Sequence, residues 1–336
     1  MNEIQRYLAE EHVEDFQDGL ITRRELIRRV TLITGSGVAA AAFLAACGVG
    51  GSPGAPAATG ATGTPSPTSA AATVTSVPQG QTPSGPYATP PAQPTTNGVT
   101  VRPDDERISA QDTEVPAADG AKLIGYLSRP RADGRYPGVL VIHENRGLLE
   151  HIKDVTRRLA TAGFVAVAFD VLSREGGAAK LEQGAYNQAL GNRSIPDMVQ
   201  DLQSVLDFLK AQPFVNGTKL GVTGFCFGGG MTWHALNSGV DVKAAVPFYG
   251  PGPSEPSGIA STKAAVLGVY AEQDSRVNAS MAAMEEQLKR AGVTYELKVY
   301  PGVNHAFHND TGSRYGADQA RQAWVDTVEW FKTHLM

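Results

Sequence analysis

Cys226 is the residue of this sequence whose surroundings most clearly favour chemistry. It lies at the centre of Gly-Phe-Cys-Phe-Gly, residues 224–228, between an apolar run typical of a strand (219–225) and a segment typical of a helix. A nucleophile elbow has this strand-turn-helix context. Gly224 and Gly228 suit it, because a β-carbon at either position would collide with the adjoining strand or helix. The alternative is a buried, inert cysteine that packs as a small hydrophobic side chain.

Two further residues with suitable chemistry follow predicted strands. Asp274 comes after the apolar run 264–271, and His305 comes after the run 295–301. Ligands gather at the carboxyl ends of the strands in a parallel α/β sheet. The order Cys226, Asp274, His305 is the nucleophile, acid, base order of the α/β-hydrolase triad. In such a triad the imidazole removes the thiol proton, the carboxylate orients the ring, and the thiolate attacks a carbonyl carbon.

Both partners of the cysteine have rivals. Asp274 by itself is also a suitable cap for a turn or for the next helix. His308 is a second candidate base and Asp310 a second candidate acid. His305 is the preferred base because it lies nearer the end of its predicted strand.

Glu144 closes the apolar run 136–144, which is typical of a strand buried on both faces. A carboxylate at the mouth of a central strand costs free energy unless it has a partner or a chemical role. A salt bridge with Arg146 or another nearby arginine is the non-catalytic alternative. The same loop is where α/β-hydrolases supply one amide of the oxyanion hole, so the backbone N–H groups of Asn145 and Phe227 are the candidate donors.

The elements that position these residues come from residues 108–336. Apolar runs rich in β-branched residues alternate there with amphipathic segments, which predicts a doubly wound, mostly parallel sheet with helices on both faces. A hairpin is predicted over residues 112–130, with its turn at Asp119 and Gly120. Further strands are expected at 136–144, 164–170, 219–225, 243–250, 264–271 and 295–301, and helices at 150–162, 194–212, 280–291 and 317–334.

The motifs "VIHENRG", "GFCFGGG", "EQDSRV" and "NHAFHND" occur in the order found in the dienelactone hydrolase family, which residues 108–336 resemble over essentially their whole length. The resemblance implies an α/β-hydrolase fold, a triad of Cys226, Asp274 and His305, and no metal or organic cofactor. It also implies that Glu144 lies against the resting thiol and helps to activate it. The implied activity, of the carboxymethylenebutenolidase type, is hydrolysis of a small carboxylic ester or lactone through a thioester on Cys226.

The chain departs from that family where the substrate carboxylate would bind. Dienelactone-cleaving members hold it with two arginines, one shortly after the histidine and one in the loop before the helix that leads to the nucleophile strand. Here Asn309 stands four residues after His305, and the loop offers only Arg174 and Arg193, neither at a matching position. A bidentate arginine clamp is therefore not expected, and the ester or lactone need not be a dienelactone.

Residues 1–46 have the pattern of an export signal. Paired arginines in "TRRELIRR" precede an apolar run over residues 30–46, which resembles a twin-arginine signal. The run ends in Leu-Ala-Ala-Cys, like a bacterial lipobox, so lipidation of Cys47 is predicted. This predicts an exported lipoprotein anchored on the extracytoplasmic side of a bacterial membrane. The alternative is an uncleaved membrane helix, although a full span needs about 20 apolar residues.

Residues 47–107 are predicted to be a disordered tether. No Asp, Glu, Lys or Arg occurs between Arg29 and Arg102, and Ala, Pro, Thr and Gly dominate. Such a composition cannot offset its ordering entropy by burial. The net charge of −5, without a basic block in the globular part, argues against nucleic acid as a partner. The expected partners are an ester or lactone and, through Cys47, a membrane.

Other function classes remain open at this stage. A non-catalytic surface binding protein could keep the hydrolase fold. A thiol-transfer centre at Cys226 would need a resolving cysteine, and Cys47 is the only other cysteine of the chain. An acyl transferase would use the same acyl-enzyme as a hydrolase.

Overall fold

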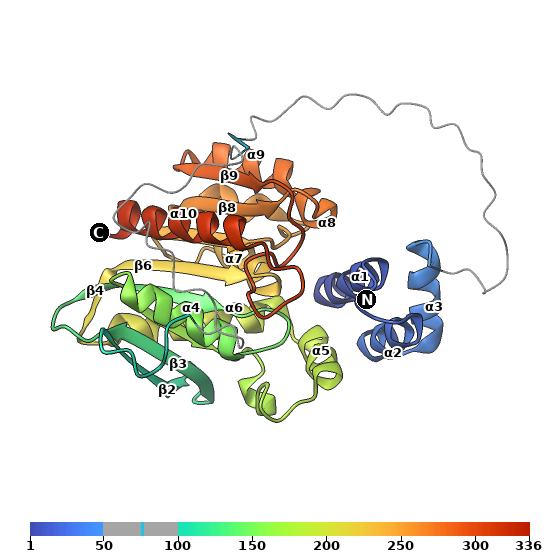
Figure 1. The fold of residues 1–336 in the computed structure, drawn as a ribbon, viewed down its shortest axis with the longest axis horizontal. Coiled ribbons are helices and arrows are strands. Elements are labelled where there is room, and N and C mark those ends of the chain that lie inside the picture. Colours follow the sequence, from blue (N-terminus) through green and yellow to red (C-terminus); the bar gives the residue numbers. More distant parts are fainter. Residues whose placement is uncertain (50–74, 77–99) are drawn as a thin grey trace. The chain divides into compact units, whose positions relative to one another are not determined.

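The computed structural model describes residues 1–49, 75–76 and 100–336. The chain divides into two compact units, shown in Figure 1. Unit 1 comprises residues 1–73 and 183–192, and unit 2 comprises residues 74–182 and 193–336. Most of the predicted tether, residues 47–107, lies outside the described residues, so its predicted disorder stays a prediction.

Unit 2 opens with the predicted hairpin. Strands β2 (Ile108–Pro116) and β3 (Lys122–Pro130) pair antiparallel from Ile108 opposite Pro130 to Pro116 opposite Lys122. The predicted turn at Asp119 and Gly120 connects them, and Gly120 has a φ of 85°, which favours glycine. Strand β3 then pairs antiparallel with β5 (Val165–Phe169).

The rest of the sheet is parallel and carries the candidate site residues. In the described part of the chain, the whole sheet has nine strands in the order β1-β9-β8-β7-β6-β4-β5-β3-β2. The parallel strands not yet named are β1 (Thr75–Ser76), β4 (Tyr136–Ile142), β6 (Val215–Phe225), β7 (Ala244–Phe248), β8 (Ala265–Ala271) and β9 (Tyr295–Tyr300). Every residue of β5, β7 and β8 is buried, as their unbroken apolar sequences predict.

Helices cover both faces of this sheet. Residues 138 and 139 of β4 pair with 220 and 221 of β6 and therefore point to alternate faces. A β-carbon at Gly138 would meet Leu209 of α6 (Ile195–Ala211), whereas one at Gly221 would meet Phe331 of α10 (Ala317–Leu335). The two helices thus pack on opposite faces, which confirms the predicted doubly wound, mostly parallel sheet with helices on both faces.

The other helical segments of unit 2 connect the strands. They are α4 (Glu150–Thr161), α7 (Phe227–Asn237), α8 (Ser275–Asn278), α9 (Met281–Ala291) and the short 3₁₀ segments η1 (Ser173–Glu175) and η2 (Pro256–Ser261).

The packed body of unit 2 begins earlier than residue 108. The backbone N–H groups of Thr100 and Val101 donate to the carboxylate of Asp154 on α4 at 3.1 and 2.8 Å, and the Val101 side chain is buried. The segment 100–107 therefore packs as part of the body of unit 2. Its polar "RPDDER" stretch has no apolar periodicity, so the sequence did not indicate this packing.

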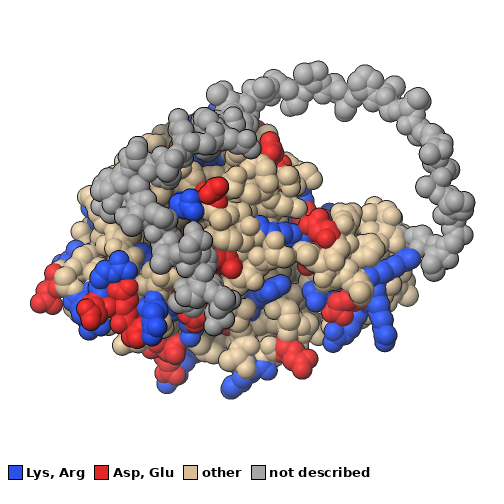
Figure 2. Space-filling view, viewed as in Figure 1, with Lys and Arg blue, Asp and Glu red and all other residues tan. Residues whose placement is uncertain are grey.

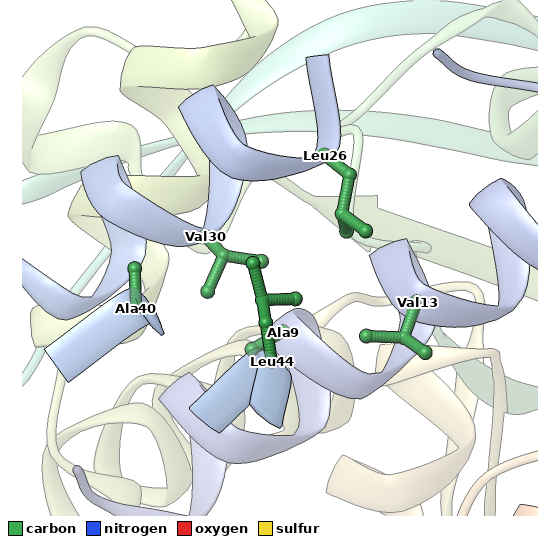
Figure 3. Close-up of a cluster of buried hydrophobic side chains, with 6 residues drawn as sticks. All are labelled: Ala9, Val13, Leu26, Val30, Ala40 and Leu44. Atoms are coloured by element: carbon green, nitrogen blue, oxygen red, sulfur yellow. The ribbon is translucent and has the colours of Figure 1, made fainter. Parts of the chain in front are cut away.

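Unit 1 contains helices from two distant parts of the chain: α1 (Glu3–Gln17), α2 (Arg23–Thr34), α3 (Gly37–Ala46) and α5 (Gln183–Asn192). The first three share an apolar cluster, drawn in Figure 3, of Ala9, Val13, Leu26, Val30, Ala40 and Leu44. Helix α5 joins them through hydrogen bonds from Asn2 to the Gly191 carbonyl (2.9 Å) and between His12 and Asn187 (3.2 Å). No pattern in the sequence indicated α5.

The apolar run 30–46 is shared between α2 and α3, and the chain bends by 117° between them. Gly35 ends α2 in the left-handed conformation, with a φ of 69°. Within the described residues, no single helix is both long and apolar enough to span a membrane; α2 and α3 reach that threshold only as a bent pair. The predicted export signal stays a prediction.

Candidate active site

Cys226 sits in a sharp turn between β6 and α7, where the elbow was predicted. Its φ and ψ are 59° and −119°, a conformation that side-chain-bearing residues rarely adopt. Its N–H donates to the Phe248 carbonyl and its C=O accepts from the Gly230 N–H, both at 3.1 Å. Hydrogen bonds on both sides of the residue therefore hold it in a strained turn.

The two glycines beside this turn have steric reasons to be glycines. A β-carbon on Gly224 would lie 2.1 Å from the Gly228 carbonyl oxygen. A β-carbon on Gly228 would lie 2.3 Å from the carbonyl oxygen of Ile142, at the end of β4. The helix after the nucleophile thus packs directly on the neighbouring strand end, and only a hydrogen atom fits between them.

Asp274 and His305 come together from the ends of β8 and β9. His305 Nδ1 and Asp274 Oδ2 are 2.6 Å apart, within a buried hydrogen bond. The other carboxylate oxygen of Asp274 accepts the Val277 N–H at 3.1 Å at the start of α8. Asp274 therefore does both things that the sequence suggested: it caps a helix and it holds the imidazole.

The charges of this pair support each other. Burial opposes the ionisation of Asp274, but the charge of His305, its hydrogen bond and the charge of Arg276 outweigh burial and lower the pKa of the carboxyl. Burial likewise opposes the charged form of His305, yet the charges of Asp274 and Cys226 raise the pKa of the imidazole well above its usual value. The site thus stabilises the imidazolium that forms when His305 accepts a proton.

The rival residues have other partners. Asp310 accepts from His151 Nδ1 at 2.9 Å and forms an ion pair with Arg158, and these contacts, working against burial, lower its pKa to about 2. The His308 ring stacks on Phe225, with centroids 5.3 Å apart, and burial lowers its pKa well below the usual value. The structure thus pairs His305, not His308, with a carboxylate.

Glu144 lies at the end of β4, as predicted, but its partner is an amide. Asn309 Nδ2 donates to Glu144 Oε2 at 2.6 Å. The orientation of that amide is set on its other side, where Asn309 Oδ1 accepts from the N–H (2.9 Å) and the hydroxyl (2.6 Å) of Thr311. The alternative partner, Arg146, is exposed.

Tyr249 is a site residue that the sequence analysis missed. It follows β7 with a φ of 34°, and its ring meets the His305 ring edge-on, with centroids 5.2 Å apart. Burial, together with the charges of Glu144 and Cys226, raises the pKa of its hydroxyl well above the usual value. The rule that strand ends carry site residues would have found it, because it lies at the end of the predicted strand 243–250 and directly after β7.

Backbone strain gathers at these strand ends. In the part of the chain that the structure describes, the non-glycine residues with positive φ are Cys226, Tyr249 and Ala306. Cys226 follows β6, Tyr249 follows β7, and Ala306 comes directly after His305. Such strain persists where the surrounding structure imposes it, as in active sites.

The two arginines of the loop before α6 are engaged elsewhere. Arg174 pairs with Asp119 and Asp201 at 2.7 and 2.8 Å, and Arg193 pairs with Asp201 at 2.7 Å. Both therefore brace this loop against carboxylates of unit 2.

Comparison with known proteins identifies relatives of this chain. Residues 123–335 match the family model described as the dienelactone hydrolase family. A protein of Methylorubrum extorquens that carries the name carboxymethylenebutenolidase is 33% identical over 254 residues, which cover 72% of this chain and 87% of the relative. An Escherichia coli K12 protein of the same name is 33% identical over 259 residues, covering 73% and 94%.

Solved structures of related proteins also match this chain. A structure described as a dienelactone hydrolase from Klebsiella pneumoniae is 32% identical with a TM-score of 0.61, and the match covers 67% of this chain and 98% of that one. A dienelactone hydrolase-like promiscuous phosphotriesterase from metagenomic libraries is 29% identical with a TM-score of 0.58, covering 68% and 100%.

Proposed function

The chain belongs to the dienelactone hydrolase family, which makes it a lactone or ester hydrolase, and we propose that it works through a thioester on Cys226. The observation that supports this route is the 2.6 Å hydrogen bond between His305 Nδ1 and Asp274 Oδ2. It leaves Nε2 of the same imidazole to serve the thiol, whose charge already acts on His305.

Acylation begins when His305 Nε2 takes the thiol proton and Cys226 Sγ attacks the carbonyl carbon of the ester. The carbonyl oxygen becomes an oxyanion, which the N–H groups of Asn145 and Phe227 stabilise. Phe227 is the first residue of α7, so its N–H has no acceptor within the helix. The C–O bond then breaks, and His305 gives its proton to the departing alkoxide.

Deacylation repeats these steps with water. His305 removes a proton from water, whose oxygen attacks the thioester carbonyl carbon. The carbon–sulfur bond breaks, the acid product leaves, and the proton returns to Cys226. Asp274 keeps Nδ1 protonated throughout and stabilises the imidazolium of each intermediate.

The acyl group, in this proposal, need not carry a carboxylate. The position four residues after His305 holds Asn309, whose side-chain amide donates a hydrogen bond to Glu144. Arg174 and Arg193 are paired with aspartates. A neutral ester or lactone therefore suits the site better than a carboxylate-bearing one, which would meet the negative charge of Glu144.

The surface supports a small-molecule substrate more than a nucleic acid. Figure 2 shows Lys and Arg side chains next to Asp and Glu side chains on the face in view. Ion pairs connect such side chains: Lys122 pairs with Glu114 in the hairpin, and Lys153 of α4 pairs with Asp112 of β2. Mixed charge of this kind does not build the basic field that a polyanion needs.

We further propose that the protein is exported and anchored in a membrane by a lipid on Cys47. The paired arginines, the apolar run 30–46 and the Leu-Ala-Ala-Cys sequence support this. Cleavage before Cys47 would remove α1, α2 and α3, and would expose the part of α5 that α1 and α2 contact. Cell fractionation followed by mass spectrometry of the N-terminal peptide tests this localisation.

The thioester route is tested by intact-protein mass spectrometry during turnover on a panel of aryl esters and lactones. The full chain and its Cys47→Ala control should both gain the mass of the acyl group, and Cys226→Ala should gain none and lose at least about 10⁴-fold in kcat. Turnover by Cys226→Ala, or an adduct on another residue, would refute the route. Adding alcohol acceptors in the same assay separates a hydrolase from an acyl transferase.

A further inference from the structure

His143 is a buried residue to which the mechanism above gives no role. It follows β4 directly, precedes Glu144 and is 0% exposed. Its Nε2 accepts the backbone N–H of Val171, beyond the end of β5, at 2.9 Å. Its Nδ1 lies 2.5 Å from the carbonyl oxygen of Glu144. The ring thus links the ends of two neighbouring strands.

These contacts determine where the ring carries its proton. A backbone N–H can only donate, so Nε2 must offer its lone pair to Val171, and a neutral ring then carries its hydrogen on Nδ1. Nδ1–H therefore donates to the Glu144 carbonyl. Burial lowers the pKa of His143, which agrees with a neutral ring.

The acceptor of this hydrogen bond belongs to the peptide group that carries a proposed oxyanion donor. The Glu144 carbonyl and the Asn145 N–H are parts of one planar peptide unit. The described residues contain no cis peptide bond, so this N–H points opposite to the carbonyl. Because His143 holds the carbonyl on its own side, the Asn145 N–H faces away from the ring.

The second proposed donor is also next to His143. The rings of His143 and Phe227 are stacked, with centroids 6.2 Å apart and an interplanar angle of 26°. A β-carbon on Gly228 would lie 2.6 Å from the His143 carbonyl oxygen. One buried ring thus contacts both segments that supply the oxyanion hole.

Asp170 secures the far end of the same loop. One of its carboxylate oxygens accepts the N–H groups of Leu148 (3.3 Å) and Ala178 (2.8 Å). The loop 143–148 is therefore held at both ends by side chains, by His143 at its start and by Asp170 at its end.

We propose that His143 is a positioning residue that orients the Asn145 amide for oxyanion stabilisation. This inference rests on the proposed function, because the amide matters only if a tetrahedral oxyanion forms. Losing one oxyanion donor typically lowers kcat by about 10²-fold to 10³-fold. Loss of the His143 hydrogen bond is expected to lower kcat by up to that factor, with little change in KM.

Two substitutions separate hydrogen bonding from packing. His143→Gln removes the ring but offers an amide N–H and a carbonyl oxygen with nearly the same separation as the two ring nitrogens. His143→Phe keeps a ring that can stack on Phe227 but has no donor or acceptor. In the full chain, His143→Gln should keep kcat within about 10-fold of wild type, whereas His143→Phe should lose about 10²-fold or more. Equal kcat values, or the reverse order, would overturn the proposal.

Alkylation of Cys226 by iodoacetamide provides a control, because this reaction builds no oxyanion. Its rate should be similar in the wild type and both variants, while the acylation rate on an aryl ester falls only in His143→Phe. If the wild type forms no acyl adduct at all, the proposed function has failed, and not the inference about His143.

A spectroscopic measurement keeps the proposal testable if His143→Phe does not fold. In wild-type protein labelled with ¹⁵N-histidine, the signals missing from His143→Gln belong to His143. They should show a protonated Nδ1 and an unprotonated Nε2. The opposite tautomer would remove the hydrogen bond to the Glu144 carbonyl and overturn the proposal.

Discussion

The two cysteines of this chain lie at opposite ends of their helices. Cys226 is the N-cap of α7, with a φ of 59°, and Cys47 is the C-cap of α3, with a φ of −83°. A helix N-terminus stabilises a nearby negative charge, and a C-terminus destabilises one. The backbone alone therefore favours a thiolate at Cys226 and a neutral thiol at Cys47.

Neighbouring charges widen this difference. Burial and the charge of Glu10 raise the pKa of the Cys47 thiol. Cys226 instead shares its surroundings with His305, which in turn is hydrogen-bonded to Asp274. Because both residues are cysteines, the difference comes from their positions in the fold, and position decides whether a thiol is suited to nucleophilic chemistry.

The largest loss of kcat should come from removing His305, the base that serves Cys226. His305→Asn leaves Cys226 in its turn but without a proton acceptor, and we expect kcat to fall by about 10⁵-fold. His308→Phe, which keeps a buried aromatic ring at the rival position, should leave kcat within about threefold of the wild-type value. Steady-state kinetics on an aryl ester would measure both, and a larger loss in His308→Phe would exchange their roles.

A smaller effect is expected from Asp274→Asn, which removes the charge that raises the pKa of His305. We expect kcat to fall by about 10³-fold to 10⁴-fold. The substitution should also lower the melting temperature in a pH-dependent way. The raised pKa of His305 stabilises the folded state fully below about pH 6.5, and this stabilisation declines as pH rises through the pKa of His305 in the folded state.

The lowered pKa of Asp274 stabilises the folded state above about pH 3.8, and this stabilisation is lost as pH falls through the pKa of Asp274 in the folded state. The difference in melting temperature between wild type and Asp274→Asn should therefore be greatest between about pH 4 and 6.5 and should shrink as pH is raised further. A difference that grows on the alkaline side would contradict the assignment of the pair.

The smallest effect on catalysis is expected at the other cysteine. Cys47→Ser should leave kcat within about twofold, because no step of the proposed mechanism uses this thiol. If Cys47 carries the lipid anchor, the same change should move the protein from the membrane fraction to the soluble fraction. Unchanged fractionation would argue against the anchor and leave the catalytic proposal intact.

Much of the fold was predictable because its signals are local. The apolar run 136–144 and the hairpin at 112–130 carry the periodicity of their strands, and the structure has both elements. Helix α5 was not predictable in the same way. Its sequence "QGAYNQALGN" has two glycines and no clear apolar stripe, and its buried face is completed by α1 and α2, far away in sequence.

The site was partly predictable for a related reason. Residues after strands could be singled out one by one, which brought Cys226, Asp274, His305 and Glu144 to attention. Their partners could not, because a hydrogen bond between Asn309 and Glu144 depends on how two loops 165 residues apart meet. His143 escaped notice because a histidine inside an apolar strand is usually a packing residue.

The sequence by itself determined the alternation of strands and helices, the glycines that permit the elbow and the order of the three triad candidates, because each depends on steric or apolar patterns between near neighbours. Only the tertiary structure decided that His305 and not His308 meets Asp274, that Glu144 is held by Asn309, and that His143 faces the Glu144 carbonyl. Hydrogen bonds act over about 3 Å, and such distances between separate strand ends exist only once the whole sheet has assembled.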